Sequence, residues 1–522
     1  MKRKKLSIPS ARFSQRCNKA KGKVVDEMQN HELCPYFDNI PSHLTVQILL
    51  QLPIKSLLIC KCVCKIWKTL ISDPHFAKLH FQKTPASLMI RTLDHRRVSR
   101  TLYLLECEPE KYEIGSDRCL KLQPIFKLPL RDAKSLREKV MNKPKRPVRA
   151  MRLVLEKNTD KNNDGDSQML NVDVKPHYDS FGIVNSCNGL FCLCCPFEGS
   201  PLVICNPVTG EFMRLPKATY TPSVPQIGQF VTSNRLSNLE PVGFGFGFQP
   251  KTNEYKVIQI WKKFVRNNNH RVFERMIFEI NTLGMPSWRN VEVDPQVSNS
   301  RLEYPTCLNG VIHWIRFEGQ TQNRSILCFC LESESLQSFP SPPHVFNNHN
   351  IISPDECIRM GESRGLLYIC DASFDYVTMW VMNEYGIGES WTKVYNIDTS
   401  ISSLGRPDRH YGLCWPLKHF EDGASILLYH SQNRLIYYEP EKYGFKVFRI
   451  CGTDSILVQI IPHTPSLISL KDAAKGDNIE VLNIYSMCAK VKLREENEVL
   501  SLFQQLVWNV GRKRSSSSYR IR

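Results

Sequence analysis

The sequence has 522 residues and lacks a membrane-span signature and two common signatures of catalytic centres. No uncharged apolar run of about 18 residues occurs, so we expect no transmembrane helix. The basic start, Met1-Lys-Arg-Lys-Lys5, is not followed by an apolar segment and a cleavage site, so we expect no secretory signal. Neither H-E-x-x-H nor a Walker sequence is present, which argues against zincin proteases and P-loop nucleotidases.

Cysteine is plentiful, at 20 residues, although the other signs of secretion are missing. We therefore expect reduced thiols in the cytoplasm, the nucleus or both, where they act as small apolar side chains. Cys192-Leu-Cys-Cys195 has C-x-x-C spacing, but no second pair follows at zinc-finger distance. We predict no metal site and no cofactor.

The formal net charge of +18 is concentrated in three segments. Residues 1–30 carry nine basic and two acidic residues, 91–160 carry 18 and 10, and 511–522 carry five and none. The rest of the chain then has a net charge of −2, which weakens the case for a broad nucleic-acid-binding face. Lys2-Arg-Lys-Lys5 and Arg512-Lys-Arg514 are read either as nuclear import signals or as solvated tails.

Residues 34–80 have the pattern of a small helical module. Pro41 and Pro53 bound a first helix that is apolar nearly all round. A short helix over 54–60 follows, and a third helix is expected to end at Asp73-Pro74. The apolar stripe of this third helix comprises Val63, Ile66, Trp67, Leu70 and Ile71. About 45 residues cannot cover so many apolar groups, so the module needs either the rest of this chain or a partner.

The same module resembles an F-box. The pieces that carry the resemblance, in order, are Ile40-Pro41, Ile48-Leu-Leu-Gln-Leu-Pro53, Ile54-Lys-Ser-Leu-Leu58, Cys62-Val-Cys-Lys-Ile-Trp67 and Leu70-Ile-Ser-Asp-Pro-His-Phe76. Ile40 departs from the commoner Leu. The resemblance implies binding to the Skp-type adaptor of an SCF ubiquitin ligase, and through it to a cullin. The residues implied for this contact are Ile40, Pro41, Leu44, Ile48, Leu49, Leu52, Pro53, Leu57, Val63 and Trp67. Trp67 and Leu70 fit the core of the module equally well.

From about residue 180 the pattern changes to short apolar runs between turn signals. Five units recur at intervals of 55 to 65 residues, led by Gly189, Gly245, Gly310, Gly365 and Gly423. Several short strands in each unit predict a propeller-like array, with a β-sandwich as the alternative. We expect Trp288, Trp314, Trp380 and Trp391 in blade cores. Residues 87–90 and 102–105 are expected to begin the same β domain.

These units also resemble the plant F-box-associated interaction domain, often described as kelch-like, over about residues 180–470. The matching pieces are Cys187-Asn-Gly-Leu190, Asn206-Pro-Val-Thr-Gly210, Phe244-Gly-Phe246, Glu254-Tyr-Lys-Val257, Asn309-Gly-Val-Ile-His-Trp314, Trp380-Val-Met-Asn-Glu-Tyr385 and Ser390-Trp-Thr-Lys393. The departure is the lysine-rich stretch 131–175. In the family this domain captures the protein to be ubiquitinated. No residue rule transfers, so the target-binding residues stay unassigned.

Three motifs mimic catalytic or cofactor sites. Gly361-Glu-Ser-Arg-Gly365 matches G-x-S-x-G, but a strand-like run follows where a nucleophile elbow needs a helix, so we expect Ser363 in a turn. The glycine-rich segment 243–247 leads into Gln249-Pro250 and predicts no dinucleotide site. His313 lies beside Trp314 in an alternating run and is expected to be structural. No catalytic residue is predicted.

The predicted fold class is a multidomain α plus all-β protein, with a small helical F-box before a large propeller-like β domain. The predicted boundaries are a basic disordered tail at 1–33, the F-box at 34–80, the start of the β domain at 85–130, a basic loop or linker at 131–178, the F-box-associated domain at 179–470, a C-terminal strand and docking helix at 471–510, and a basic tail at 511–522. The helix, over 495–510, could dock on the β domain or on a partner.

The resemblances imply a non-catalytic substrate receptor of a ubiquitin ligase, which binds the adaptor and an unidentified target protein. Two other classes stay open. The basic tails would suit a nucleic-acid or chromatin binder, and exposed aromatic residues on the β domain would suit a glycan-binding module. Ser363 is the only residue that supports a hydrolase.

Overall fold

The computed structural model describes residues 40–485 with internal gaps. The gaps are 94–97, 106–118, 122–123, 129–181, 195–200, 221–237, 268–269, 293–299, 319–323, 344–357, 373–375, 399–413, 420–425, 431–433, 441–443, 452–456 and 478. The chain divides into two units, 1–48 and 49–522. The predicted import signals, the basic loop or linker at 131–178 and the C-terminal helix lie outside the described residues.

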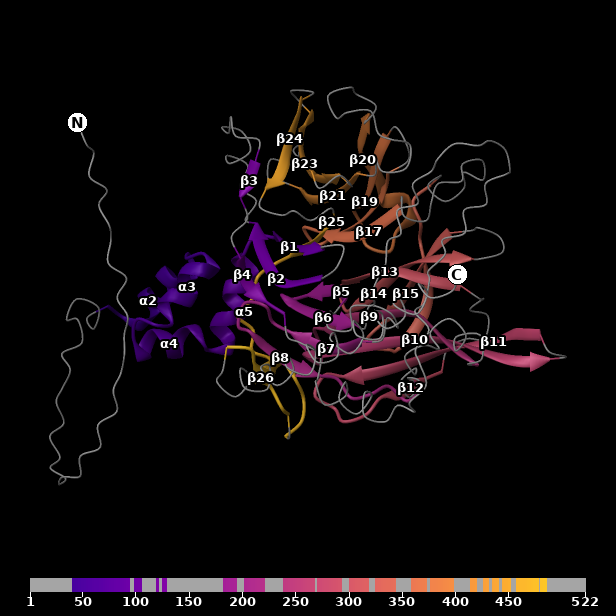
Figure 1. Ribbon diagram of the computed structural model, residues 1–522, viewed down its shortest axis with the longest axis horizontal. Helices are drawn as coiled ribbons and strands as arrows, with labels where there is room; N and C mark the ends of the chain where they lie inside the picture. Colours follow the sequence, from indigo (N-terminus) through magenta and orange to yellow (C-terminus); the bar gives the residue numbers. More distant parts are fainter. Residues whose placement is uncertain are drawn as a thin grey trace, which may run out of the picture. The chain divides into compact units, whose positions relative to one another are not determined.

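Four short helices form the described part of the F-box (Figure 1). They are α2 (Ser42–Leu50), α3 (Ile54–Cys60), α4 (Lys65–Ile71) and α5 (Pro74–Lys83). The first three match the sequence expectation. Asp73-Pro74 ends α4 and also begins α5, a helix that the pattern did not indicate. The Asp73 carboxylate accepts hydrogen bonds from the backbone N–H groups of His75 and Phe76 at 2.8 and 3.1 Å, and Pro74 occupies the first turn.

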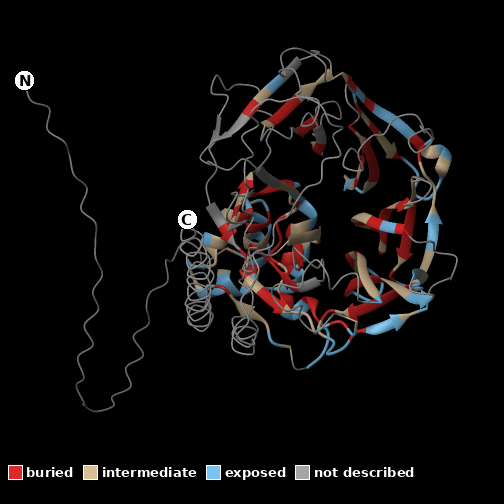
Figure 2. Ribbon diagram, turned by 45° about the vertical axis from the view of Figure 1, so that its right-hand side comes forward, coloured by how far each residue is buried: buried red, intermediate tan, exposed pale blue. Residues whose placement is uncertain are grey.

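Six mainly antiparallel sheets form the six blades of a propeller, which confirms the predicted fold class (Figure 2). Blade I is β25 (Leu457–His463), β1 (Ser87–Leu93), β2 (Val98–Leu105) and β4 (Pro124–Lys127). Blade II is β5 (Gly182–Cys187), β6 (Leu190–Cys194), β7 (Pro201–Cys205), β8 (Glu211–Arg214) and β26 (Leu482–Asn483). Blade III is β9 (Leu239–Gln249), β10 (Glu254–Asn267), β11 (His270–Thr282) and β12 (Arg289–Val291).

The other three blades complete the ring. Blade IV is β13 (Ser300–Leu308), β14 (Val311–Glu318), β15 (Arg324–Cys330) and β16 (Ser335–Phe339). Blade V is β17 (Ile358–Ser363), β18 (Leu366–Asp371), β19 (Tyr376–Met382) and β20 (Trp391–Asp398). Blade VI is β21 (Cys414–His419), β22 (Ile426–His430), β23 (Arg434–Glu439), β24 (Gly444–Cys451) and the parallel strand β3 (Cys119–Lys121). The first strand of each blade is the innermost, and these inner strands contact one another in the order β25, β5, β9, β13, β17, β21.

The ring closes by pairing the two ends of the β domain. The late strand β25 pairs with the early strand β1 over seven residue pairs, from Ser87 opposite His463 to Leu93 opposite Leu457. Strands β1 and β2 therefore belong to the same propeller as the later repeats. Blade I was not recognised as a repeat because its inner strand lies far from its other strands in the sequence.

The apolar core lies between neighbouring blades. Five clusters of buried side chains among the described residues each join two adjacent blades. In β10, Val257 packs towards blade II, whereas Ile258 and Ile260 pack towards blade IV. Both faces of a blade are thus buried, which explains apolar runs without strict alternation. Trp288, Trp314 and Trp391 are buried as predicted, and Trp380 is half-buried against the cluster between blades IV and V.

Two kinds of glycine underlie the sequence repeat. Gly189, Gly310 and Gly365 are second residues of two-residue turns between first and second strands, where both turn residues have positive φ. Gly245 instead lies inside β9, and Gly423 lies outside the described residues. A Cβ on Gly245 would stand 2.8 Å from Trp314 Cζ2, and one on Gly247 2.9 Å from Cys307 Sγ. The glycine-rich segment therefore allows close approach of blade IV, and no helix follows it.

We expect Gly245→Ala to lower the free energy of unfolding by about 1–3 kcal/mol, because the new methyl group clashes with the buried Trp314 ring. Urea unfolding followed by tryptophan fluorescence measures this. Gly388→Ala is the control: its Cβ would meet only Pro340 Cβ, at 3.3 Å, so a change within about 0.5 kcal/mol is expected. Equal stability of Gly245→Ala and wild type would contradict the close-packing role.

Two buried histidines predict a pH dependence of stability. Burial lowers the pKa of His313 to about 4 and that of His463 to about 3. In the unfolded chain both imidazoles take up a proton as the pH falls through about 6.5, whereas in the native state they stay neutral to a lower pH. The free energy of unfolding therefore decreases as the pH falls below about 6.5. Between pH 7.5 and 5 we expect about 2 kcal/mol of destabilisation from each histidine.

Thermal unfolding across this pH range checks the expectation. His313→Gln should reduce the pH dependence of the melting temperature, because it removes one of the two imidazoles whose pKa burial lowers. An identical pH dependence in wild type and His313→Gln would contradict the assignment.

Candidate functional site

Large apolar side chains are exposed on the F-box helices. Leu44 and Ile48 stand one turn apart on α2 and are 42% and 56% exposed. In the second unit, Ile59, Val63 and Ile66 are 69%, 63% and 55% exposed. Exposed apolar side chains of this size are typical of protein-interaction surfaces, and each unit carries some of them.

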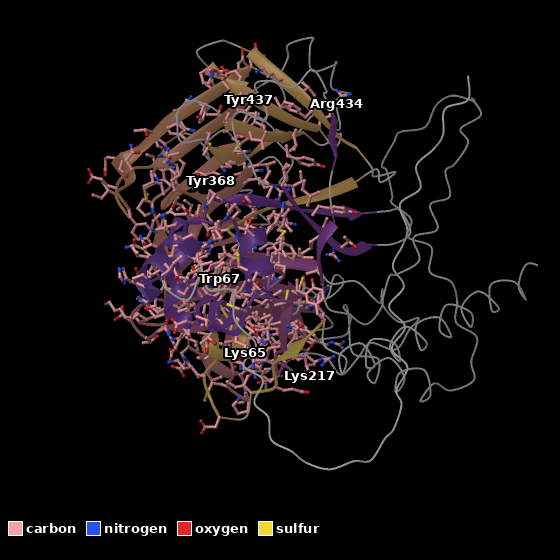
Figure 3. The ribbon with its side chains drawn as sticks, turned by 90° about the vertical axis from the view of Figure 1, so that its left-hand side faces the viewer. Lys65, Trp67, Lys217, Tyr368, Arg434 and Tyr437 are labelled. Atoms are coloured by element: carbon pink, nitrogen blue, oxygen red, sulfur yellow. The ribbon has the colours of Figure 1, made fainter. Side chains whose placement is uncertain are left out.

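The ten residues predicted to contact an adaptor differ in their environments. Those that are exposed are Pro41, Leu44, Ile48, Pro53 and Val63; those half-buried are Ile40, Leu52 and Trp67; those buried are Leu49 and Leu57. Trp67 lies on α4, where its backbone N–H donates to Cys64 Sγ at 3.4 Å (Figure 3). Adaptor contact stays a prediction for all ten.

Two exposed residues, Ile59 and Ile66, were missing from the predicted set. The sequence pattern places Ile66 on the apolar stripe of the third helix. In the structure Ile71 is the fully buried residue of this helix, and Ile66 is exposed. Ile59 follows the buried Leu57 in α3. The excess of apolar groups over available core was the signal that could have identified both.

Internal packing fixes the helices that carry these side chains. The His80 ring Nε2 lies 3.0 Å from the Leu52 carbonyl oxygen, and Nδ1 lies 3.1 Å from Thr84 Oγ1. Burial lowers the pKa of His80, which favours the neutral ring in this position. This histidine links the start of α3 to the end of α5, so the exposed groups of the second unit lie on a packed scaffold.

The antiparallel blades give the propeller two different faces. Turns between first and second and between third and fourth strands lie on one face, here called the short-turn face. The connections between second and third strands and between blades lie on the opposite one, the long-connection face. The connection that contains the basic insertion leaves β4 and enters β5, so both its ends lie on the long-connection face.

A C-terminal segment, residues 464–485, lines part of the short-turn face. The Asn206 side chain donates to the carbonyl oxygens of Ser466 and Ile468 at 3.0 and 2.8 Å. The Glu211 carboxylate accepts from the Leu470 N–H at 2.7 Å, at the start of α9 (Leu470–Ala473). The Lys475 N–H donates to the Leu283 carbonyl oxygen at 2.7 Å. The C-terminal segment therefore covers part of the short-turn face at blades II and III.

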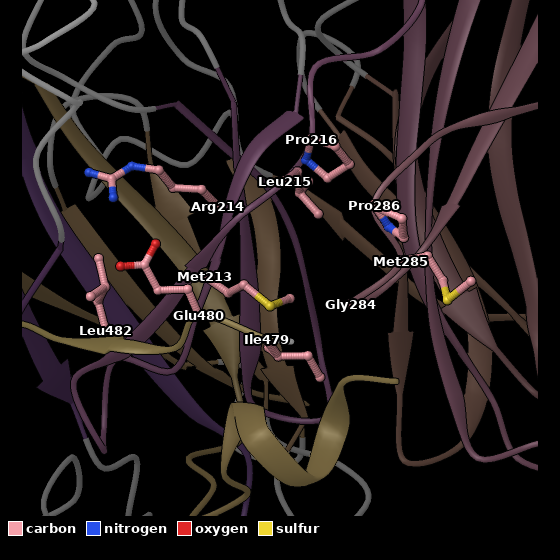
Figure 4. A pocket seen from close by; sticks show the side chains of 10 residues that line it. All are labelled: Met213, Arg214, Leu215, Pro216, Gly284, Met285, Pro286, Ile479, Glu480 and Leu482. Atoms are coloured by element: carbon pink, nitrogen blue, oxygen red, sulfur yellow. The ribbon is translucent and has the colours of Figure 1, made fainter. Parts of the chain in front are cut away.

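A groove of about 300 Å³ opens beside this segment (Figure 4). Its lining residues are Met213, Arg214, Leu215, Pro216, Gly284, Met285, Pro286, Ile479, Glu480 and Leu482. The lining is mostly apolar, with one cation and one carboxylate. No combination of nucleophile and base faces it, so its chemistry suits contact more than catalysis.

The three motifs that mimic active sites have structural roles. Ser363 ends β17 beside the Arg364-Gly365 turn, and β18 follows, so the nucleophile elbow is absent here. His313 is fully buried, with Nδ1 3.2 Å from the Thr306 carbonyl oxygen and Nε2 2.9 Å from the Tyr385 hydroxyl. Its lowered pKa keeps the ring neutral, which fits the structural role that was predicted.

No group of three metal-ligating side chains occurs within the part of the chain that the structure describes. Cys192 is buried in β6, where burial raises the pKa of its thiol well above the usual value. The eleven cysteines whose side chains the structure describes are free thiols. Among the described helices, none has both the length and the apolar character needed to cross a bilayer.

Comparison with known proteins agrees with both halves of the structure. A family model described as the F-box domain matches residues 37–79, and one described as the F-box associated beta propeller domain matches residues 140–468. Among solved structures, TolB from Acinetobacter baumannii is similar at 9% identity, with 77% of this chain and 73% of that chain covered and a TM-score of 0.31.

Curated relatives are plant F-box proteins. The chain is 23% identical to F-box protein At3g07870 of Arabidopsis thaliana, over 82% of this chain and 91% of that protein. It is 25% identical to F-box/LRR-repeat protein At2g43260 of the same plant, over 83% and 85%, and 22% identical to F-box/kelch-repeat protein At3g23880, over 72% and 83%. Because the β-propeller model matches more than half of the chain, the chain belongs to the F-box proteins with an F-box associated β-propeller domain.

Proposed function

We propose that this protein is the substrate receptor of an SCF-type ubiquitin ligase: its F-box binds a Skp-type adaptor, and its propeller holds the protein to be ubiquitinated. The observation that carries the proposal is a set of exposed apolar side chains on the helices of a matched F-box, in a chain that continues into a matched propeller domain. Exposed isoleucine, leucine and valine at such a density suit a permanent protein partner.

The strand order supports different roles for the two faces of the propeller. Residues 84–86 alone separate α5 from β1, and β1 begins on the short-turn face. The Lys418 ammonium group donates to the Ala86 carbonyl oxygen at 2.7 Å, which ties this junction to blade VI. The long-connection face is thus the one away from the junction, and we assign target capture to it.

Such a receptor needs no catalytic residue of its own. It acts by holding a target lysine near a ubiquitin-loaded enzyme brought by other subunits, so that a bimolecular reaction becomes effectively intramolecular. The structural roles of His313 and Ser363 are in keeping with a receptor that supplies geometry instead of chemistry.

Ile48→Asp and Val63→Asp, made separately, should each weaken adaptor binding at least about tenfold, because each places a charge in an apolar contact. Both side chains are exposed in the free chain, so the free energy of unfolding should change by no more than about 0.5 kcal/mol. Binding is measured by titrating purified Skp-type adaptor with the full-length protein, in parallel with urea unfolding.

Val394→Asp is the matched control, since Val394 is a similarly exposed apolar residue on blade V. It should bind the adaptor as wild type does. Leu57→Ala provides a second comparison, because it empties a fully buried site and should cost about 2–5 kcal/mol of F-box stability. Undiminished adaptor binding by both Ile48→Asp and Val63→Asp would refute the proposed function.

A further inference from the structure

One hairpin of the propeller extends beyond the strands that flank it in its blade. Strands β10 and β11 have 14 and 13 residues, and they pair with each other out to Asn267 and His270. Their neighbours stop earlier: β9 pairs with β10 only as far as Lys263, and β12 pairs with β11 only at residues 278–280. Residues 262–267 and 270–275, here called the hairpin arm, form the outer end of this hairpin, most of which extends past the paired parts of β9 and β12 (Figure 1).

The arm lies on the long-connection face, because it joins the second and third strands of blade III. Among the described residues, the outer edge of β11 from His270 to Ile277 has no strand partner. A free strand edge offers backbone N–H and C=O groups to an added extended chain.

The arm is strongly basic. Its described residues include five cations, Lys262, Lys263, Arg266, Arg271 and Arg275, and one acid, Glu274. Arg266 and Arg271 stand directly opposite each other in the β10–β11 ladder, a like-charge pairing that disfavours the hairpin by itself. A cost of this kind is offset when an anion binds between the two guanidinium groups.

The surroundings neutralise only part of this charge. Glu274 pairs with Lys263 at 3.0 Å, and Glu240 pairs with Arg271 at 3.4 Å. The Arg271 guanidinium lies 3.7 Å from the Phe264 ring centroid, and two of its nitrogens, Nε and Nη2, have no hydrogen-bond partner among the described residues. Burial, together with the nearby Arg301 and Arg271, lowers the pKa of Lys262 despite Glu240.

Apolar groups accompany the cations. Val265 and Val272 are paired across the ladder and are 41% and 46% exposed. Phe264 and Phe273 meet edge to face, with ring centroids 6.1 Å apart. The combination of a free strand edge, alternating cations and exposed valines matches an extended peptide that alternates carboxylate and apolar side chains.

We propose that the hairpin arm captures an acidic, extended segment of the target protein, which adds as a strand along the edge of β11. The inference rests on the proposed function and names the chemistry of the captured segment. A nucleic acid fits less well, because exposed valines and the carboxylates of Glu240 and Glu274 would face its phosphates.

The test uses the full-length protein and a fluorescein-labelled peptide of alternating Glu and Val residues. Fluorescence anisotropy should show saturable binding to wild type, and binding about tenfold weaker to the Arg266→Glu/Arg271→Glu double variant. The matched control is Lys251→Glu/Lys475→Glu, with the same change of charge on exposed residues of the short-turn face, which should bind as wild type does. A Lys/Val peptide and a short DNA duplex are the competing probes.

Absence of binding by the Glu/Val peptide, an equal loss in both double variants, or preferential binding of the duplex would each overturn the proposal. Adaptor binding by the same proteins is measured in parallel. It should be unchanged in both double variants, so that failure of the arm is distinguished from failure of the receptor function itself.

Discussion

The propeller depends on the pairing between β25 and β1. Seven residue pairs join a strand that ends at His463 to one that begins at Ser87. The pairing supplies the inner strand of blade I, allows its apolar side chains to pack against blade VI, and removes the two sheet edges that an open array would expose. The ring cannot close until nearly the whole chain is present, because β25 ends at His463. Helix α5 leads directly into β1, and the C-terminal segment follows β25.

Closure also determines where function can be located. With six blades in a ring, the turns between first and second and between third and fourth strands fall on one face, and the connections between second and third strands and between blades fall on the other. The F-box joins the short-turn face through β1, and the C-terminal segment covers part of that same face through Asn206 and Glu211. The hairpin arm lies on the opposite face. The total charge gave little indication of the arm, because its cations lie in a stretch that is nearly neutral on average.

Much of this organisation was predictable, for identifiable reasons. Asn-Gly turns at Asn188 and Asn309 require positive φ at both residues, so they mark hairpins wherever they recur. Pro41, Pro53 and Pro74 restrict the backbone locally and therefore located the helix boundaries, although α5 was missed because Asp73-Pro74 suits a helix start as well as a helix end. Blade I, the two-sided packing of β10 and the exposure of Ile59 depend on the arrangement of segments distant in sequence, which local patterns do not encode.

Local chemistry thus specified the elements: proline and capping residues for the helices, Asn-Gly turns and β-branched runs for the strands, and the excess of apolar groups for the F-box surface. The tertiary structure determines how these elements are arranged in space. Contacts and strand register between segments that meet only after folding decide three features. They decide which isoleucines stay exposed, why position 245 needs glycine, and that Arg266 lies opposite Arg271. Burial and strand register are properties of the assembled chain, and no window of sequence contains both partners of a contact between blades.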